Sequence, residues 1–246
     1  MKFRRHETVK WHDTDANRCA RPTEILAYMQ ETANLHLHAY HSNLDTLRDE
    51  RGLAFLLSRV TVELLAPLHA FDEIDVETWN SDGEGSQFLR FFRIWRGEEL
   101  VAEAMSVWAL LDLNSGRLLR NNQFSYPFDG DEAITPRYPV RFRVPKLDQM
   151  ERVGERRIVF SDIDYNHHMN NTKYPDMLCD FIPDIENRRV RGFSLSYLGE
   201  AAFGKTLEVY RSEQDGDFCF RTLDGESGKV CLEACVFTEP IQKEET

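Results

Sequence analysis

The stretch Asp13-Thr14-Asp15-Ala16-Asn17 recurs in the second half of the chain as Asp162-Ile163-Asp164-Tyr165-Asn166, at an offset of 149 residues. Further along, Ala70-Phe71 matches Ala202-Phe203 at an offset of 132, each pair standing just before a strand-like run. Self-similarity at two points of one chain indicates two related halves. The smaller second offset predicts that the second copy has lost residues between these points.

Each half has the same predicted order of elements: a short strand, a helix after the D-x-D-x-N stretch, and an antiparallel meander of strands. In the first half the helix runs from Pro22 to about His41, and the strands cover 53–65, 74–80, 88–95 and 100–113. In the second half a strand at 156–160 precedes a helix at 170–181 and strands at 190–198, 206–212, 217–222 and 229–238. A long helix wrapped by a curved antiparallel sheet is the hot-dog architecture, whose open edge needs a second copy to cover it. The sequence therefore predicts an α+β tandem double hot-dog.

A proline-rich stretch separates the two halves. It shows no helical periodicity and contains Pro127, Pro136, Pro139 and Pro145, as expected of a long covalent connection. We therefore predict an N-terminal domain at 1–125, a linker at 126–150 and a C-terminal domain at 151–246.

Composition excludes several classes of protein. The net charge of −12 would repel a nucleic-acid backbone. No apolar run is long enough to span a membrane, and the N-terminus lacks the apolar core of a signal peptide. The five cysteines are odd in number and form no CxxC pair, which favours a reduced, cytoplasmic protein without a structural metal.

The second copy of the repeat is the richer one in chemistry. Asp164, Asn166 and His168 alternate, so in an extended segment they would share one face. The first copy has Cys19 where the second has His168. A helix follows, and its first free N–H groups could stabilise an oxyanion. Thioester hydrolysis needs little more, because the leaving thiol is already a weak base.

Two structural interpretations compete with a catalytic one. A D-x-D-x-N run can be a polar turn that precedes a helix, and we assign only that role to the first copy. His36, His38 and His41 look like a metal cluster, but positions two apart lie on opposite sides of a helix and no two of these histidines are four residues apart. We therefore expect neither a metal nor an organic cofactor.

The run D-x-D-x-N-x-H-x-N-N, followed by a helix, a strand and Tyr-x-x-Glu at 197–200, resembles the plant and bacterial acyl-ACP thioesterases. The segments 57–59, 76–79 and 102–108 are similar to that family as well, so the resemblance covers nearly the whole chain. It implies hydrolysis of fatty acyl-[acyl carrier protein] (acyl-ACP) to free fatty acid and ACP, with acyl-chain binding in the N-terminal domain and catalysis in the C-terminal domain. A homodimer is one assembly compatible with it.

The resemblance also implies which residues act: Asp164, Asn166, His168 and Glu200. Plant members often carry a cysteine directly after the glutamate, whereas this chain has Ala201, so a cysteine nucleophile is not available there. Two routes stay open. Asp164 could attack the carbonyl directly, or Glu200 and His168 could activate a water while Asp164 orients His168. We favour the water route. Rival functions are an acyl-CoA thioesterase, a hot-dog dehydratase and a non-catalytic acyl-binding protein.

Basic residues gather near the linker although the chain as a whole is acidic. Residues 136–157 carry seven Lys or Arg residues and three Asp or Glu residues. An acidic carrier protein could bind there through long-range attraction. We therefore predict that ACP docks on Arg137, Arg141, Arg143 and Lys146.

Overall fold

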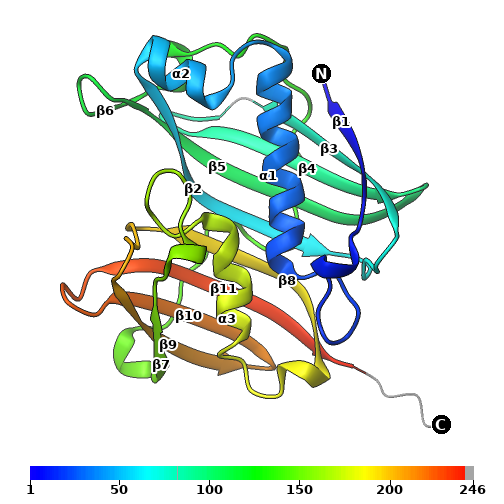
Figure 1. Ribbon diagram of the computed structural model, residues 1–246, viewed down its shortest axis with the longest axis vertical. Coiled ribbons are helices and arrows are strands. Elements are labelled where there is room, and N and C mark those ends of the chain that lie inside the picture. The colour runs from blue at the N-terminus through cyan, green and yellow to red at the C-terminus, as the bar shows by residue number, and fades with distance from the viewer. Residues whose placement is uncertain (82, 242–246) are drawn as a thin grey trace. The chain divides into compact units, whose positions relative to one another are not determined.

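The structure is a computed structural model that describes residues 1–81 and 83–241. The chain divides into two compact units, Met1–Ala20 with Glu24–Val140, and Arg21–Thr23 with the chain from Arg141 onward. The division between Val140 and Arg141 falls inside the stretch predicted as the linker. Within each unit the neighbouring strands are antiparallel (Figure 1).

In the N-terminal unit, α1 lies across one face of the sheet (Figure 1). α1 covers Pro22–Ala39 and begins with a proline, whose fixed φ and missing N–H suit the first helical turn. The strand order is β1-β3-β4-β5-β2, with β6 beside β5. The bounds are β1 Phe3–Thr8, α2 Leu44–Arg51, β2 Leu53–Leu64, β3 Glu73–Ser81, β4 Phe88–Arg96, β5 Glu99–Asp112 and β6 Arg117–Leu119.

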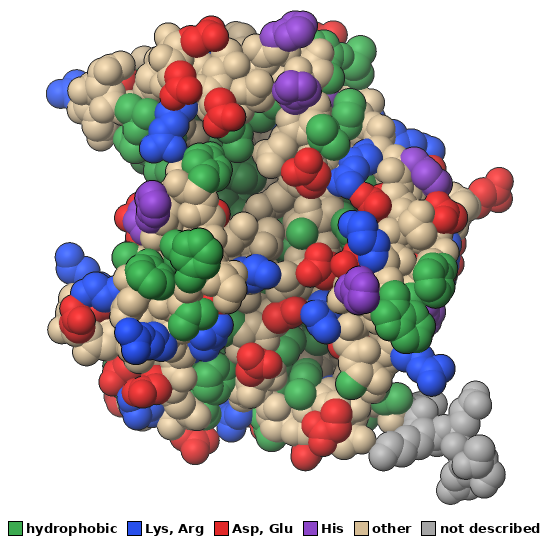
Figure 2. Space-filling view, in the orientation of Figure 1, with side chains coloured by type: hydrophobic (Ala, Val, Ile, Leu, Met, Phe, Trp, Pro, Cys, Tyr) green, Lys and Arg blue, Asp and Glu red, His purple; other side chains and the backbone are tan. Residues whose placement is uncertain are grey.

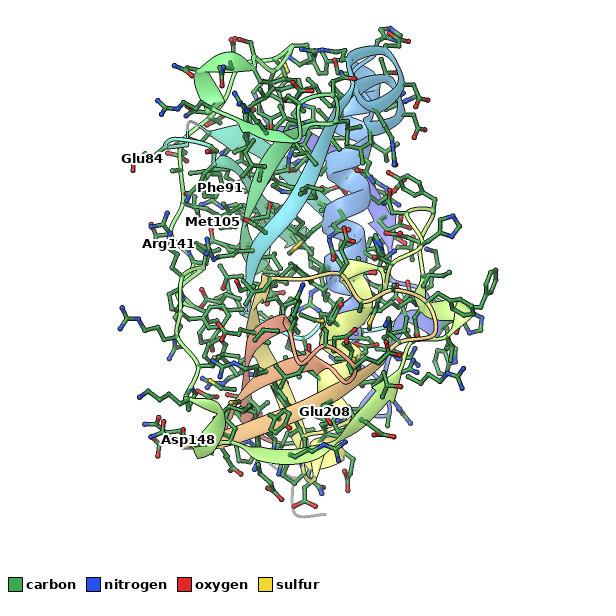
Figure 3. All side chains as sticks on the ribbon, turned by 90° about the vertical axis from the view of Figure 1, so that its left-hand side faces the viewer. Glu84, Phe91, Met105, Arg141, Asp148 and Glu208 are labelled. Atoms are coloured by element: carbon green, nitrogen blue, oxygen red, sulfur yellow. The ribbon has the colours of Figure 1, made fainter. Side chains whose placement is uncertain are left out.

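The opposite face of this sheet is covered by part of the linker. Phe91 and Met105 are cross-strand partners on β4 and β5, and Figure 3 shows them on the side of the sheet that points away from α1. Next to Phe91, Trp79 donates its indole N–H to the carbonyl oxygen of Glu132 at 2.7 Å. At the other end of the row, the Thr61 hydroxyl donates to the carbonyl oxygen of Tyr138 at 3.0 Å. These two bonds hold the linker against the sheet, although 124–146 forms neither helix nor strand.

The C-terminal unit repeats the plan with a shorter helix. Its strand order is β8-β11-β10-β9-β7, with all pairs antiparallel. The bounds are β7 Glu151–Arg157, α3 Tyr174–Cys179, β8 Arg188–Tyr197, β9 Thr206–Gln214, β10 Asp217–Asp224 and β11 Val230–Pro240. Alternate β10 residues Phe218, Phe220 and Thr222 have no exposed surface and form the inner face.

Matched hydrogen bonds confirm the repeat and correct one of its offsets. Phe71 donates its N–H to the Val9 carbonyl oxygen (2.8 Å), and Gly204 donates to Ile158 in the same way (3.0 Å). Val9 and Ile158 are 149 residues apart, but Phe71 and Gly204 are 133 apart, one more than the predicted 132. Both Phe71 and Gly204 have positive φ, at 71° and 84°. Residues with the same turn conformation therefore match at an offset of 133, whereas the two Ala-Phe pairs match at 132 and are misaligned by one residue.

Four elements differ from the sequence prediction, and one of them is the short strand β6 at Arg117–Leu119, which was not predicted. The predicted helix at 170–181 is a 3-10 turn at Asn171–Lys173 followed by the six residues of α3, and Pro183 stands shortly after its end, where a helix cannot continue. The strand predicted at 156–160 is instead β7 at Glu151–Arg157. α2 escaped prediction because Leu47 is its one buried residue, although Asn43 caps it and Gly52 ends it with φ 64°.

Candidate active site

The motif around Asp164 forms a tight turn and not the extended segment that the alternation argument assumed. The Asp164 N–H donates to the His168 carbonyl oxygen, and the His167 N–H donates to the Asp164 carbonyl oxygen, both at 3.0 Å. The Asp164 carboxylate accepts the Asn166 N–H at 2.8 Å, and His167 has a φ of 64°. The strand-like shared face was therefore wrong. Asp164 and His168 are half-buried, whereas Tyr165, Asn166 and His167 are exposed.

The turn brings His168 to Glu200. His168 forms an antiparallel bridge with Ala202, and the Met169 N–H donates to the Ala201 carbonyl oxygen at 2.8 Å. This pairing places the His168 Nε2 atom 3.1 Å from the Glu200 Oε2 atom. The Glu200 side chain is 74% exposed and that of His168 is 35% exposed, so water can reach both. The structure thus joins two predicted site residues that lie 32 positions apart.

Asp162 stabilises the start of the turn, although the sequence analysis did not assign it a role. Its buried carboxylate accepts the Val159 N–H at 2.8 Å and the Arg156 Nη2 donor at 2.7 Å. Its carbonyl oxygen accepts the Asn170 N–H at 2.9 Å. The sequence signal was available, because Asp162 is the first residue of the repeated D-x-D and its counterpart Asp13 accepts a backbone N–H in the same way.

Tyr197 ties the strand before Glu200 to the turn after His168. Its hydroxyl donates to the Asn171 carbonyl oxygen at 2.8 Å, and its ring packs edge-on against Tyr174 with centroids 5.6 Å apart. Burial raises the pKa of Tyr197 well above its usual range, so the hydroxyl stays a donor. Tyr197 is the tyrosine of the quoted Tyr-x-x-Glu pattern, which sequence reasoning used for recognition only.

The first half has the same turn but lacks the counterparts of His168 and Glu200. The Asp15 N–H donates to the Cys19 carbonyl oxygen at 2.8 Å, and the Asp15 carboxylate accepts the Asn17 N–H at 2.8 Å. Arg18 has a φ of 62°, in the position of His167. At the two structural offsets, Cys19 stands in place of His168 and Pro67 in place of Glu200.

The histidines near the end of α1 do not form a metal site. The described residues include no group of three or more His, Cys, Asp or Glu side chains placed to share a metal ion. His36 is fully buried and stacks on Phe128 with ring centroids 3.8 Å apart. Its Nδ1 atom lies 3.3 Å from Arg90 Nη1. Burial, reinforced by the Arg90 charge, lowers the pKa of His36 to about 3, so the ring is neutral and structural.

The four basic residues predicted to dock ACP are all exposed but divide between the units. Arg137 belongs to the N-terminal unit, whereas Arg141, Arg143 and Lys146 belong to the C-terminal unit. Figure 3 shows Arg141 on the linker. In the lower part of Figure 2, which is the C-terminal unit, basic and acidic side chains alternate and do not form one basic face. Arg143 itself lines a pocket with acidic residues of the β9–β10 turn.

Comparison with known proteins places this site in a family. The family model described as the acyl-ACP thioesterase N-terminal domain matches residues 1–123, and that of the C-terminal domain matches 146–234. The chain belongs to the acyl-ACP thioesterase family. The resemblance seen in the sequence is therefore confirmed, and the thioesterase motif at 162–171 lies within the C-terminal match. Within the described residues, no helix combines the length and the apolar character needed to cross a membrane.

Curated relatives of this chain are distant and longer. The chain is 23% identical over 228 residues to the palmitoyl-acyl carrier protein thioesterase of Cuphea hookeriana. That alignment covers 85% of this chain and 54% of the relative. The chain is 21% identical to the dodecanoyl-[acyl-carrier-protein] hydrolase of Cinnamomum camphora, with 95% and 66% covered. The chain thus spans about half the length of the first of these relatives.

Solved structures confirm the fold. An acyl-ACP thioesterase from Bacteroides thetaiotaomicron superposes with a TM-score of 0.87 at 23% identity, covering 97% of this chain and 98% of that one. The 12:0-ACP thioesterase of Umbellularia californica gives a TM-score of 0.84 at 18% identity, with 97% of each chain covered. The α+β tandem double hot-dog predicted from the sequence is therefore the fold of this chain.

Proposed function

We propose that this protein hydrolyses the thioester of fatty acyl-ACP, with catalysis in the C-terminal domain and acyl-chain binding in the N-terminal domain. The observation that carries the proposal is the His168–Glu200 pair at 3.1 Å, held in a turn that lies within the match to the C-terminal domain of the family. The relatives are named for palmitoyl- and dodecanoyl-ACP, which supports a fatty acyl substrate. We expect a cytoplasmic location, because the five cysteines are odd in number and form no CxxC pair.

In the proposed mechanism, Glu200 and His168 activate a water. The water oxygen attacks the thioester carbonyl carbon as its proton passes to the His168–Glu200 pair. The negative charge that develops on the carbonyl oxygen is stabilised by the Asn166 amide. The backbone N–H groups of Met169, Asn170, Thr172 and Lys173 already donate to protein acceptors. The tetrahedral intermediate then breaks its C–S bond, and the proton returns to the departing thiolate.

Direct attack by Asp164 is the alternative route, and its product would be an acyl-enzyme anhydride. The structure supports the water route because Glu200, and not Asp164, lies beside the imidazole, while the Asp164 carboxylate is bonded to the Asn166 N–H. Asp164 then acts chiefly by shaping the turn that presents His168. Rapid-quench mass spectrometry distinguishes the routes, because an acyl adduct on the peptide that contains Asp164 would contradict water attack.

The activity is tested with a panel of acyl-ACPs from octanoyl to stearoyl and with the matching acyl-CoAs. We expect a higher kcat/KM for acyl-ACP, and loss of most of the hydrolysis in His168→Ala. A preference for acyl-CoA would assign the rival thioesterase function. Tight acyl binding without turnover by the folded wild-type protein would assign a non-catalytic one.

We further propose that ACP approaches the basic linker at Arg137, Arg141, Arg143 and Lys146. Their exposure supports this proposal, as does a net charge of −12 that would repel an acidic carrier elsewhere. Arg141→Glu with Lys146→Glu should lower kcat/KM for acyl-ACP, more so at low salt, and leave a small uncharged thioester unaffected. Arg189→Glu is the matched control, because Arg189 is ion-paired with Glu239. If the control variant alone loses activity on acyl-ACP, the docking surface lies near β8. Light scattering of the same samples tests the homodimer.

A further inference from the structure

Two cysteines face each other across neighbouring strands of the C-terminal unit. Cys219 on β10 and Cys235 on β11 are direct antiparallel partners in the sheet register. Directly opposed Cα atoms of an antiparallel pair lie about 4.5–5.5 Å apart, which falls inside the range of about 4.4–6.8 Å that a disulfide spans. Both cysteines are free thiols in this structure.

The side chains, and not only the backbones, are on the same side of the sheet. The next opposed pair on that face, Arg221 and Glu233, makes a salt bridge, with Arg221 Nε donating to Glu233 Oε1 at 3.0 Å. Since side chains alternate along a strand, Cys219 and Cys235 point the same way as that pair. The Cys235 thiol lowers the pKa of Cys219, while burial and the nearby Asp217 oppose the shift.

One of the two thiols can be reached from outside. Cys219 is half-buried and lines a pocket of about 740 Å³ together with Arg143, Pro145, Gln149, Ser212 and Phe237. Cys235 is only 6% exposed. A small reagent in the pocket can therefore contact Cys219 first, with Cys235 behind it.

We propose that Cys219 and Cys235 form a modification site, a dithiol that low-molecular-weight disulfides of the glutathione class oxidise reversibly to a cross-strand disulfide. The Cys219 thiolate attacks one sulfur of the small disulfide, breaks its S–S bond and releases one small thiolate. Cys235 then loses its proton and attacks the Cys219 sulfur of the mixed disulfide, releasing the second thiolate. Two protein thiols are oxidised, and one external disulfide is reduced to two thiols.

The remaining cysteines offer internal controls. Cys231 lies on β11 at the register shift between Thr222 and Leu223, where it has no direct partner on β10. Burial raises the pKa of its thiol. Cys19 and Cys179 are half-buried but have no cysteine opposite them. A disulfide between any of these would indicate unfolding or a different arrangement of the sheet.

The test is to treat the folded, full-length protein with oxidised glutathione, to block free thiols with an alkylating reagent under denaturing conditions, and to map peptides by mass spectrometry. We expect loss of two of the five thiols, one peptide pair linked through Cys219 and Cys235, and full recovery on reduction. Cys235→Ser should stop at a stable glutathione adduct on Cys219, and Cys219→Ser should leave Cys235 unmodified. Cys231→Ser should behave as wild type.

Three results would overturn the proposal. One is an adduct on Cys219 that persists in the wild-type protein without resolving to a disulfide. Another is equal oxidation of the wild type and Cys219→Ser. The third is a Cys219–Cys235 link that forms only after the circular dichroism signal of the folded protein is lost. None of these readouts requires thioesterase activity.

Discussion

The turns at Asp13–Cys19 and Asp162–His168 share a backbone but not a chemistry. Each uses an aspartate carboxylate to accept the N–H two residues on, at 2.8 Å in both turns, and each has one residue near φ 60° before the key position. At that position one turn has Cys19 and the other has His168. The aspartate and asparagine of the motif therefore specify a turn, and the proposed water activation depends on two further residues that only the second half possesses.

The largest effect should come from the residue that differs most between the turns. His168→Ala should lower kcat by about 10²–10⁴-fold, because it removes the imidazole that activates water. Acyl-ACP hydrolysis and thermal melts check the change and the integrity of the fold. His167→Ala and Cys19→Ala are the matched controls, and both should keep nearly full activity. Equal losses in the His167 and His168 variants would place the base elsewhere.

Glu200→Gln tests the other half of the pair. Removal of the Glu200 carboxylate should lower kcat by about 10²-fold, at the lower end of general acid–base effects. The side chain is 74% exposed, so a water can partly replace the carboxylate. Glu226→Gln is the control, since Glu226 has the same exposure and pairs with Lys205 instead. Turnover by Glu200→Gln that matches the control would assign the water-activating role to Asp164.

Buried His36 should make the free energy of unfolding depend on pH. The pKa of buried His36 is about 3 in the folded N-terminal unit and near 6.5 in an unfolded chain. Unfolding therefore takes up a proton, and the free energy of unfolding should fall by up to about 1.4 kcal/mol per pH unit as pH drops from about 6.5 toward 3. His36→Asn keeps an acceptor for Arg90 and should flatten this slope in acid denaturation curves.

The smallest effect concerns the bond that ties Glu200's strand to the turn. Tyr197→Phe removes the hydroxyl that donates to Asn171 and should lower the free energy of unfolding by about 1–2 kcal/mol. It should lower kcat by about tenfold with little change in KM, because the substrate-binding surface is intact. The counterpart of Tyr197 in the first half is Leu64. A change in stability without any change in kcat would make Tyr197 a purely structural residue.

The sequence predicted the fold and the site residues from different kinds of signal. Long strands with regular alternation and turn residues located the meanders to within a few residues. The repeat located the turns, because Asp and Asn bond their own backbone locally. The length of α3 could not be predicted from the same motif, since a 3-10 turn and a helix begin with the same residues.

What the sequence could not provide was the pairing between segments. The register that sets His168 opposite Ala202 depends on an offset of 133, and the Ala-Phe match suggested 132. The opposition of Cys219 and Cys235 depends likewise on the register of two paired strands. Such contacts arise from strand pairing over long sequence distances, which local patterns do not encode.

The shared backbone also makes the first half a vacant scaffold for enzyme engineering. Cys19 already bridges to His69 as His168 does to Ala202. Pro67 contributes to its surroundings through its carbonyl oxygen, which accepts from Arg96 at 3.1 Å, and a glutamate would keep that carbonyl. Cys19→His with Pro67→Glu is thus the minimal pair of substitutions that would place an imidazole and a carboxylate on a turn with the same backbone conformation. Such a variant would distinguish the features that the two halves share from those that only the second half has.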